Sequence, residues 1–145
     1  MSDRKIALFA DLHSNLEAFE ACLEHAYAEG ATELVFLGDI VGYNADPVAL
    51  VERVAELVDS GKAIAVMGNH DQAVFTDHST RMNKSAWAAI QWTRDQLGDD
   101  HTSFLKQLPL IHKEEDFCFV HASASKPDSW SYVDGGMAAW HCAES

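Results

Sequence analysis

Short apolar runs alternate with segments of helical periodicity through the first half of the chain. The runs at 5–10, 33–37 and 63–67 are nearly continuous in apolar residues, which is typical of strands buried on both faces of a parallel sheet. Between them, apolar residues recur at helical spacing after Leu16 and after Leu50. This order of strand, helix and strand predicts an α/β fold, in which right-handed crossovers join the strands of a parallel sheet.

Capping residues indicate where the first two helices begin. Ser14, with Glu17 three residues later, has the spacing of a capping box. Asp46 precedes Pro47, an order typical of a helix N-cap followed by proline in the first turn. A glycine follows each helical pattern and is expected to end that helix.

The second half of the chain predicts further helices and two strands. A helix is expected over 84–97, and a shorter helical piece over 102–108. Strands are expected at 110–113 and 117–121, joined by an acidic turn, and the remaining residues show no clear periodicity. No linker or internal repeat interrupts the pattern, so we expect one domain over residues 1–145.

Composition is that of an ordinary globular domain. The 145 residues are 48% hydrophobic and 23% charged, and no apolar run approaches the roughly 20 residues that cross a bilayer. The N-terminal residues lack the apolar stretch of a signal peptide, so we expect a cytoplasmic protein without membrane contact. Three widely spaced cysteines favour reduced thiols, and Cys22 and Cys118 are expected to be buried.

The formal net charge of −13 at pH 7 restricts the possible partners. A surface this acidic argues against binding to nucleic acid, whose backbone is recognised by Lys and Arg. It would also repel a phosphate ester unless bound divalent cations reverse the local field. Some of the acidic residues are therefore candidate metal ligands, and most are expected to be solvated surface.

Polar residues that can bind metal follow four of the expected strands. They are, in chain order, Asp11 and His13, then Asp39, then Asn69 and His70, and finally His121. In open α/β sheets, ligands gather at the C-terminal ends of the strands, so we expect these side chains to lie close together.

The donor atoms of this set are carboxylate and amide oxygens and imidazole nitrogens, without a thiolate. Such ligands suit manganese, iron, zinc or similar divalent ions. Asp11 and His13 are two residues apart, so in an extended segment both side chains point the same way. Asp39 has two oxygens and can bridge two ions, whereas Asn69 adds a ligand without adding charge. Each signal alone is weak, but four in succession at strand ends indicate a metal site.

The order of these motifs resembles the calcineurin-like metallophosphoesterase superfamily. The motifs are Asp11-Leu12-His13, Gly38-Asp39, Gly68-Asn69-His70-Asp71 and Val120-His121. The stretches DLHSNLEA, GDIVGYNADP and VHAS followed by WSYV are similar to small bacterial and archaeal members. The resemblance implies a metallophosphoesterase-type α/β/β/α sandwich that hydrolyses phosphomonoesters or phosphodiesters with two divalent metal ions.

The resemblance also implies a role for each candidate ligand. Asp11 and His13 would bind the first metal ion, and Asp39 would bridge both. Asn69 and His121 would bind the second ion. The substrate would be a phosphate-ester small molecule, for which a nucleotide is one candidate.

The third motif also supplies the residues that the resemblance makes catalytic. His70 would face the substrate without binding metal, and would stabilise charge or protonate the leaving group. Asp71 would orient the ring of His70.

The final Gly-His-x-His motif of the family has no match in the chain. Nothing after His121 fits it, and His141 stands alone between Trp140 and Cys142. We therefore expect a C-terminally shortened domain that lacks the last strands of the sandwich and the two histidine ligands of that motif. An uncovered sheet edge would favour self-association. A second function stays open, that of a catalytically impaired metal-binding fragment or interaction module.

Two groups of residues near these motifs stay ambiguous. Tyr43 and Asn44 either line a substrate pocket or belong to a structural loop. The tryptophans have no regular spacing, and we expect them to pack in the core or at its edge; they are Trp87, Trp92, Trp130 and Trp140.

Overall fold

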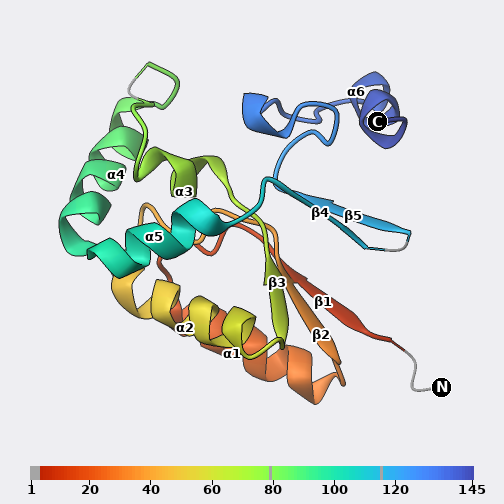
Figure 1. Ribbon diagram of the computed structural model, residues 1–145, viewed down its shortest axis with the longest axis horizontal. Coiled ribbons are helices and arrows are strands. Elements are labelled where there is room, and N and C mark those ends of the chain that lie inside the picture. The colour runs from red at the N-terminus through yellow and green to blue at the C-terminus, as the bar shows by residue number, and fades with distance from the viewer. Residues whose placement is uncertain (1–3, 79, 115) are drawn as a thin grey trace.

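Three parallel strands form the centre of the molecule. The computed structural model describes residues 4–78, 80–114 and 116–145. The strands, in spatial order, are β1 (Ile6–Phe9), β2 (Glu33–Phe36) and β3 (Ala63–Ala65) (Figure 1). Phe9 is paired with Phe36, and Phe36 with Ala65, so all three strands end at the same edge of the sheet. The parallel sheet expected from the sequence is confirmed.

Two helices cover one face of this sheet. α1 (Leu16–Ala28) and α2 (Pro47–Asp59) lie side by side against it (Figure 1). The rings of Phe9, Phe19 and Phe36 pack together there, with centroids 5.5 to 5.9 Å apart. Edge-to-face contacts of this kind stabilise a core beyond the area that they bury.

An antiparallel hairpin packs against the opposite face of the sheet. β4 (Ile111–Glu114) pairs with β5 (Phe117–Val120), as the sequence predicted. Phe119 of β5 is buried against Val35 and Val66 of the first sheet. The order is therefore a helical layer, a parallel sheet and a second sheet, as expected for the sandwich. The acidic turn between the two strands includes Glu115, which lies outside the described residues.

The first helix begins one residue later than the sequence suggested. Its N-cap is Asn15, whose side chain accepts a hydrogen bond from the Ala18 amide at 3.1 Å. Ser14 is buried, with φ of 56°, and its amide donates to the carbonyl of Ile40 at 2.9 Å. Ser14 is therefore not the cap; its backbone forms part of the turn that contacts the loop after β2.

The second helix begins where the sequence predicted. Asp46 is its N-cap and Pro47 opens it, although the Asp46 side chain makes no capping hydrogen bond. After β3, a five-residue helix that the sequence did not suggest, α3 (Asn69–Ala73), starts within the Gly-Asn-His-Asp motif. Its length is too short for a helical period to show.

The remaining helices lie around the ends of the sheet. α4 (Lys84–Gln96) starts at the N-cap Asn83, and α5 (Asp99–Gln107) is close to the predicted short helix. The tail expected to lack periodicity forms a 3-10 turn (Pro127–Ser129) and α6 (Gly136–Ala143), which lies beyond the hairpin (Figure 1). No residue of α6 is buried, and its eight residues, most of them apolar, do not show the alternation of apolar and polar positions that indicates a helix.

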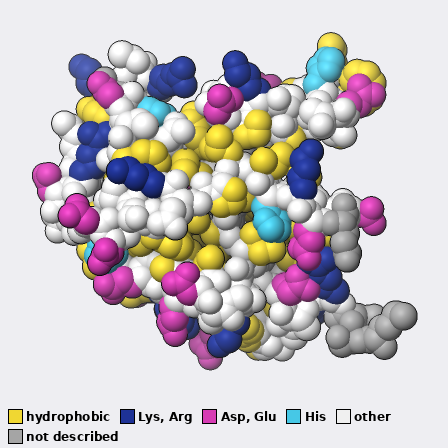
Figure 2. Space-filling view, viewed as in Figure 1, with side chains coloured by type: hydrophobic (Ala, Val, Ile, Leu, Met, Phe, Trp, Pro, Cys, Tyr) yellow, Lys and Arg dark blue, Asp and Glu magenta, His cyan; other side chains and the backbone are white. Residues whose placement is uncertain are grey.

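Charge is dispersed on the surface. Figure 2 shows Asp and Glu side chains scattered over the face in view rather than gathered in one patch. This agrees with the expectation that most acidic residues are solvated. Among the described residues, no helix combines the length and the apolarity that a membrane crossing requires.

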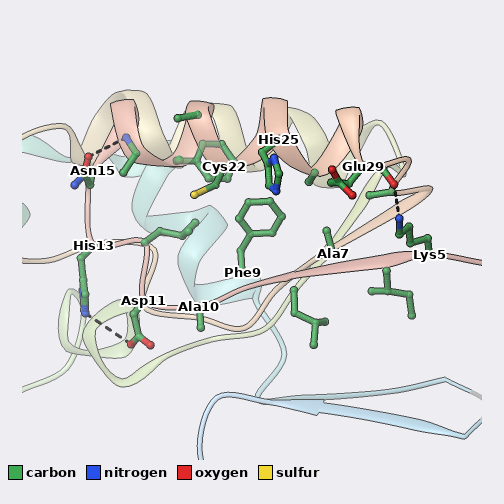
Figure 3. Close-up of a pocket in the computed structure, with 18 of the residues that line it drawn as sticks. Lys5, Ala7, Phe9, Ala10, Asp11, His13, Asn15, Cys22, His25 and Glu29 are labelled. Atoms are coloured by element: carbon green, nitrogen blue, oxygen red, sulfur yellow. Dashed lines mark hydrogen bonds and ion pairs between the residues drawn. The ribbon is translucent and has the colours of Figure 1, made fainter.

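The cysteines correct an expectation. Cys22 and Cys118 are both exposed, although both lie in apolar segments. Cys22 projects from α1 into a groove beside β1, together with His25 (Figure 3). β1 has β2 on one side only, and in the described part of the chain nothing pairs with its other edge. The cavity between this edge and α1 has a volume of about 810 Å³, so a residue on this side of α1 meets open space.

Candidate metal centre

The candidate ligands meet in one cavity at the C-terminal ends of the strands. The cavity has a volume of about 310 Å³. The predicted residues that line it are Asp11, His13, Asp39, Asn69, His70 and His121. They come from four separate loops and strand ends, which the parallel sheet and the hairpin bring together. The arrangement predicted from the strand ends is therefore the one that the structure has.

Left-handed backbone turns direct these side chains into the cavity. Asp11, His13 and Asp39 have φ values of 55°, 47° and 53°, and Tyr43 has 66°. Such values are uncommon outside glycine and collect at functional sites. The argument that Asp11 and His13 converge because their segment is extended is thus wrong. They converge through a turn, with His13 Nε2 3.8 Å from Asp11 Oδ1 (Figure 3).

Two glycines allow the loops after β2 and β3 to touch. A Cβ on Gly68 would lie 2.1 Å from Asp39 Oδ1 and 2.2 Å from the Asp39 amide nitrogen. A Cβ on Gly38 would lie 2.6 Å from the Gly68 nitrogen, and Gly38 itself has φ of 96°. The glycine that precedes each polar motif is therefore required by close approach of the two backbones.

The side chains form two groups that share Asp39. One contains Asp11, Asp39 and His121, and the other His13, Asp39 and His70; within each group the ligand atoms lie within 4.8 Å of one another. Oδ2 of Asp39 is 3.8 Å from His13 Nε2 and 3.5 Å from His121 Nε2. Two neighbouring donor groups with one common carboxylate fit a pair of divalent ions.

Backbone carbonyls orient the two histidines that flank Asp39. His121 Nδ1 is 2.8 Å from the carbonyl of Leu37, and His13 Nδ1 is 3.0 Å from that of Val41. A carbonyl only accepts, so each Nδ1 carries the proton and each Nε2 presents its lone pair to the centre. Asn69 Oδ1 lies 3.2 Å from His121 Nε2 and faces the same space. A histidine that binds metal through one ring nitrogen usually donates its other N–H in this way, as His13 and His121 do to these carbonyls.

Asp71 has a different partner from the one expected. Its Oδ1 accepts from the Val41 amide at 3.2 Å, and its Oδ2 from the Gly68 amide at 2.9 Å. Nδ1 of His70 is buried and has no hydrogen-bond partner among the described residues. The structure thus does not show Asp71 orienting the His70 ring; Asp71 instead ties together the loops after β2 and β3.

Burial shifts the titration of three groups in the centre. It raises the pKa of Asp39 to about 7, assisted by the nearby charge of Asp11 and opposed by the hydrogen bond from the His70 amide. It also raises the pKa of Asp71 to about 7, with Asp39 contributing. Burial, with the neighbouring His13, lowers the pKa of His70 to about 4, so His70 is neutral at pH 7. A divalent ion bound to Asp39 would stabilise its charged form and lower the pKa of Asp39 again.

Aromatic side chains form the rim of the cavity. Tyr43 packs against His13 and His70, with both centroid distances at 4.8 Å. Trp130 and Tyr132 also line the cavity. Tyr43 is thus a pocket residue, and Trp130 is not only a packing residue as the sequence suggested. The sequence signal that could have revealed Trp130 and Tyr132 is their place, about ten residues after His121, the histidine that follows β5.

His141 lies apart from this site. It is exposed on α6 and is not among the residues that line the cavity. Among the described residues, His141 therefore does not replace either histidine of the final family motif.

A calcineurin-like phosphoesterase family model matches residues 4–140, and the chain belongs to this family. It is 38% identical over 133 residues to the uncharacterized protein MJ0912 of Methanocaldococcus jannaschii, covering 88% of this chain and 53% of that protein. It is 26% identical over 115 residues to a symmetrical bis(5'-nucleosyl)-tetraphosphatase of Paraburkholderia phymatum, covering 79% and 40%.

A solved structure shares the fold. The metallophosphoesterase from Sphaerobacter thermophilus superposes with a TM-score of 0.72 at 35% identity, covering 90% of this chain and 51% of that one. The chain thus has a metallophosphoesterase fold and spans about half the length of the relatives that it matches.

Proposed function

We propose that the chain is a metal-dependent phosphoric ester hydrolase. The observation that carries the proposal is the pair of donor groups that share Asp39, inside a cavity at the ends of the parallel strands. Family membership supports hydrolysis of a phosphate ester as the reaction. Two divalent ions, when bound, would activate water and neutralise the phosphoryl oxygens.

The proposed ligand roles keep Asp39 as the shared carboxylate of the two donor groups, but take the other ligands from the family motifs. Asp11 and His13 would hold one ion, Asn69 and His121 the other, and Asp39 both. The distances of 3.5 and 3.8 Å from Asp39 Oδ2 to the two imidazoles support this assignment. The fixed Nδ1 protons leave both Nε2 atoms ready to ligate without a change of tautomer.

His70 would act on the substrate. Its pKa of about 4 keeps the ring neutral at pH 7, so it can donate one N–H to a phosphoryl or leaving-group oxygen. No Lys or Arg is among the described residues that line the cavity. Charge neutralisation of a phosphate would therefore depend on the bound cations, and His70 would supply a directional hydrogen bond.

A titration with Mn²⁺ together with hydrolysis of a chromogenic phosphodiester tests the proposal. We expect close to two ions per chain and metal-dependent turnover. His70 lies within ligand distance of His13 and Asp39, so His70→Ala separates its two possible roles. Full metal occupancy with reduced turnover supports a catalytic role, whereas loss of one ion makes His70 a ligand. Absence of both metal binding and turnover in the unaltered chain would refute the proposal.

The free edge of β1 supports a second candidate function, an interaction role with another copy of the chain. The backbones of Lys5, Phe9 and Asp11 bond towards β2, so Ile6 and Leu8 direct theirs to the open edge. Leu8 is 59% exposed, although it lies within a strand.

A second copy is the proposed occupant, because each copy offers the same open edge with an exposed Leu8. If two copies pair antiparallel with Leu8 opposite Leu8, the two leucines meet across the joint, and the two α1 helices lie on the same face of a continuous sheet.

A further inference from the structure

The cavity wall has two chemically different parts. The floor holds the candidate ligands, while the rim carries Tyr43 from the loop after β2 and Trp130 and Tyr132 from the segment after β5. No Lys or Arg of the described residues lines the cavity, so in this part of the chain no lysine or arginine is available at the rim to contact a substrate. A substrate group that lies against Tyr43, Trp130 or Tyr132 meets an aromatic ring.

Trp130 is fixed in place. Its φ is 56°, and its Nε1 donates to Oε1 of Gln72 in α3 at 3.0 Å. Its ring lies 6.0 Å from the ring of His121, at an interplanar angle of 70°. The segment that carries Tyr132 is thus anchored beside a candidate metal ligand and to the helix that begins at Asn69.

Tyr132 is the most exposed large hydrophobic side chain in the described part of the chain, at 90%. It differs from Tyr43, whose ring contacts both His13 and His70. In the described residues the ring of Tyr132 meets no other ring, and its hydroxyl has no hydrogen-bond partner there. An aromatic residue exposed at the mouth of a polar pocket is positioned to bind a planar ligand group.

The size of the cavity indicates which part of a substrate enters it. At about 310 Å³ it is at the small end of the range of roughly 300–1,000 Å³ for ligand sites. A phosphate group fits among the candidate ligands, and a larger organic group must lie across the rim. A flat organic group would then cover Tyr132.

We propose that Tyr132, on the segment anchored by Trp130, forms a stacking subsite for the base of a nucleotide whose phosphate enters the metal centre. The proposal rests on the proposed function for the position of the phosphate. Stacking on an aromatic ring accepts any base, so the subsite selects nucleotides over simple phosphate esters without selecting one base.

The experiment compares the binding of two non-hydrolysable ligands to the Mn²⁺-loaded chain by calorimetry. They are the methylenephosphonate analogues of AMP and of ribose 5-phosphate, which differ by the base alone. We expect the base to tighten binding about 5- to 100-fold in the unaltered chain. Tyr132→Ala should remove most of this ratio and leave the affinity for the ribose analogue unchanged, whereas Tyr132→Phe should retain it.

Tyr27→Ala is the control, because Tyr27 is an exposed tyrosine, at 46%, on α1 and does not line the cavity. It should leave both affinities unchanged. Equal binding of the two ligands to the unaltered chain would overturn the proposal, and so would a ratio that survives Tyr132→Ala. The ratio is measured without turnover. A chain that binds the base selectively but hydrolyses nothing therefore contradicts the proposed function alone.

Discussion

The backbone amide of His70 donates a hydrogen bond to Oδ1 of Asp39 at 2.8 Å. The amide thereby occupies one carboxylate oxygen and leaves Oδ2 to face His13 and His121. The Asp39 side chain is only 5% exposed, so its negative charge is largely shielded from water. A single residue thus connects the loop after β2, the loop after β3 and both candidate donor groups.

Asp39→Asn should abolish metal binding at the shared position without unfolding the chain. The amide oxygen can still accept from His70, but the charge that two cations would share is gone. We expect fewer than two Mn²⁺ per chain by elemental analysis and loss of phosphodiester turnover. The metal-free melting temperature should stay at or above that of the unaltered chain, because a buried carboxylate is removed. Asp59→Asn, at the exposed end of α2, is the matched control, and full occupancy in Asp39→Asn would contradict the assignment.

Metal affinity should rise with pH and level off near pH 7. The pKa of Asp39 is raised to about 7 in the metal-free chain, so below that pH a proton competes with the metal for this carboxylate. Displacement of one proton lowers the apparent affinity by about tenfold for each pH unit below 7. Mn²⁺ titrations between pH 5.5 and 8.5 measure this slope. An affinity that does not change over this range would contradict the prediction.

The raised pKa values of Asp39 and Asp71 should make the metal-free chain less stable as pH rises. The folded state binds a proton at Asp39 and at Asp71 more tightly than the unfolded state does. Each group therefore stabilises fully below its ordinary pKa of 3.8, and this contribution is lost as pH rises through about 7. His70 has the opposite effect. Because its pKa is lowered to about 4, its contribution to the stability of the folded chain increases as pH rises from about 4 to 6.5. Metal affinity is thus the clearer readout.

Gly68→Ala should destabilise the fold and disturb the centre together. The added Cβ would lie 2.1 Å from Asp39 Oδ1, which is far inside van der Waals contact, and the nearest atoms include backbone. We expect a loss of about 1–3 kcal/mol in the free energy of unfolding, measured with urea. The control is Gly136→Ala in α6, where an added Cβ meets nothing within 4 Å. Equal stabilities of the two variants would show that the loops can separate at no cost.

Leu8→Lys should reduce self-association. Lysine at the centre of an edge strand opposes pairing with another strand, and two copies would place like charges opposite each other. We expect a concentration-dependent dimer for the unaltered chain in sedimentation velocity, and a monomer for the variant. Trp92→Lys, which changes an exposed side chain on α4, should leave the dimer intact. A monomeric unaltered chain would exclude this second candidate function.

The sequence predicted those elements that have a local and regular pattern of apolar residues. The strands that became β1, β2 and β3 are apolar runs, and the polar residues after them could be read as converging because parallel strands share an edge. The start of α1 was misassigned because Ser14 and Asn15 are adjacent and both can cap. The choice between them depends on the bond from Ser14 to Ile40, which local pattern does not contain.

Other features depend on contacts between distant parts of the chain. The left-handed turns at Asp11 and His13 are stabilised by hydrogen bonds to the loop after β2. Trp130 is positioned by Gln72, which lies 58 residues away in the sequence. Neither relationship has a period or a spacing that a sequence displays, so the anchoring of Trp130 and the route by which the ligands converge could not be predicted.

The hydrogen bonds from Val41 and Gly68 to Asp71, and from His70 to Asp39, tie the loops after β2 and β3 to each other. Neither loop can leave its place without breaking bonds that belong to the other. Local opening should therefore be concerted, so that hydrogen exchange reports one common opening free energy for the amides of Val41, Gly68 and His70. Thermal fluctuations would then open both loops together, and the pocket would be either fully formed or lost.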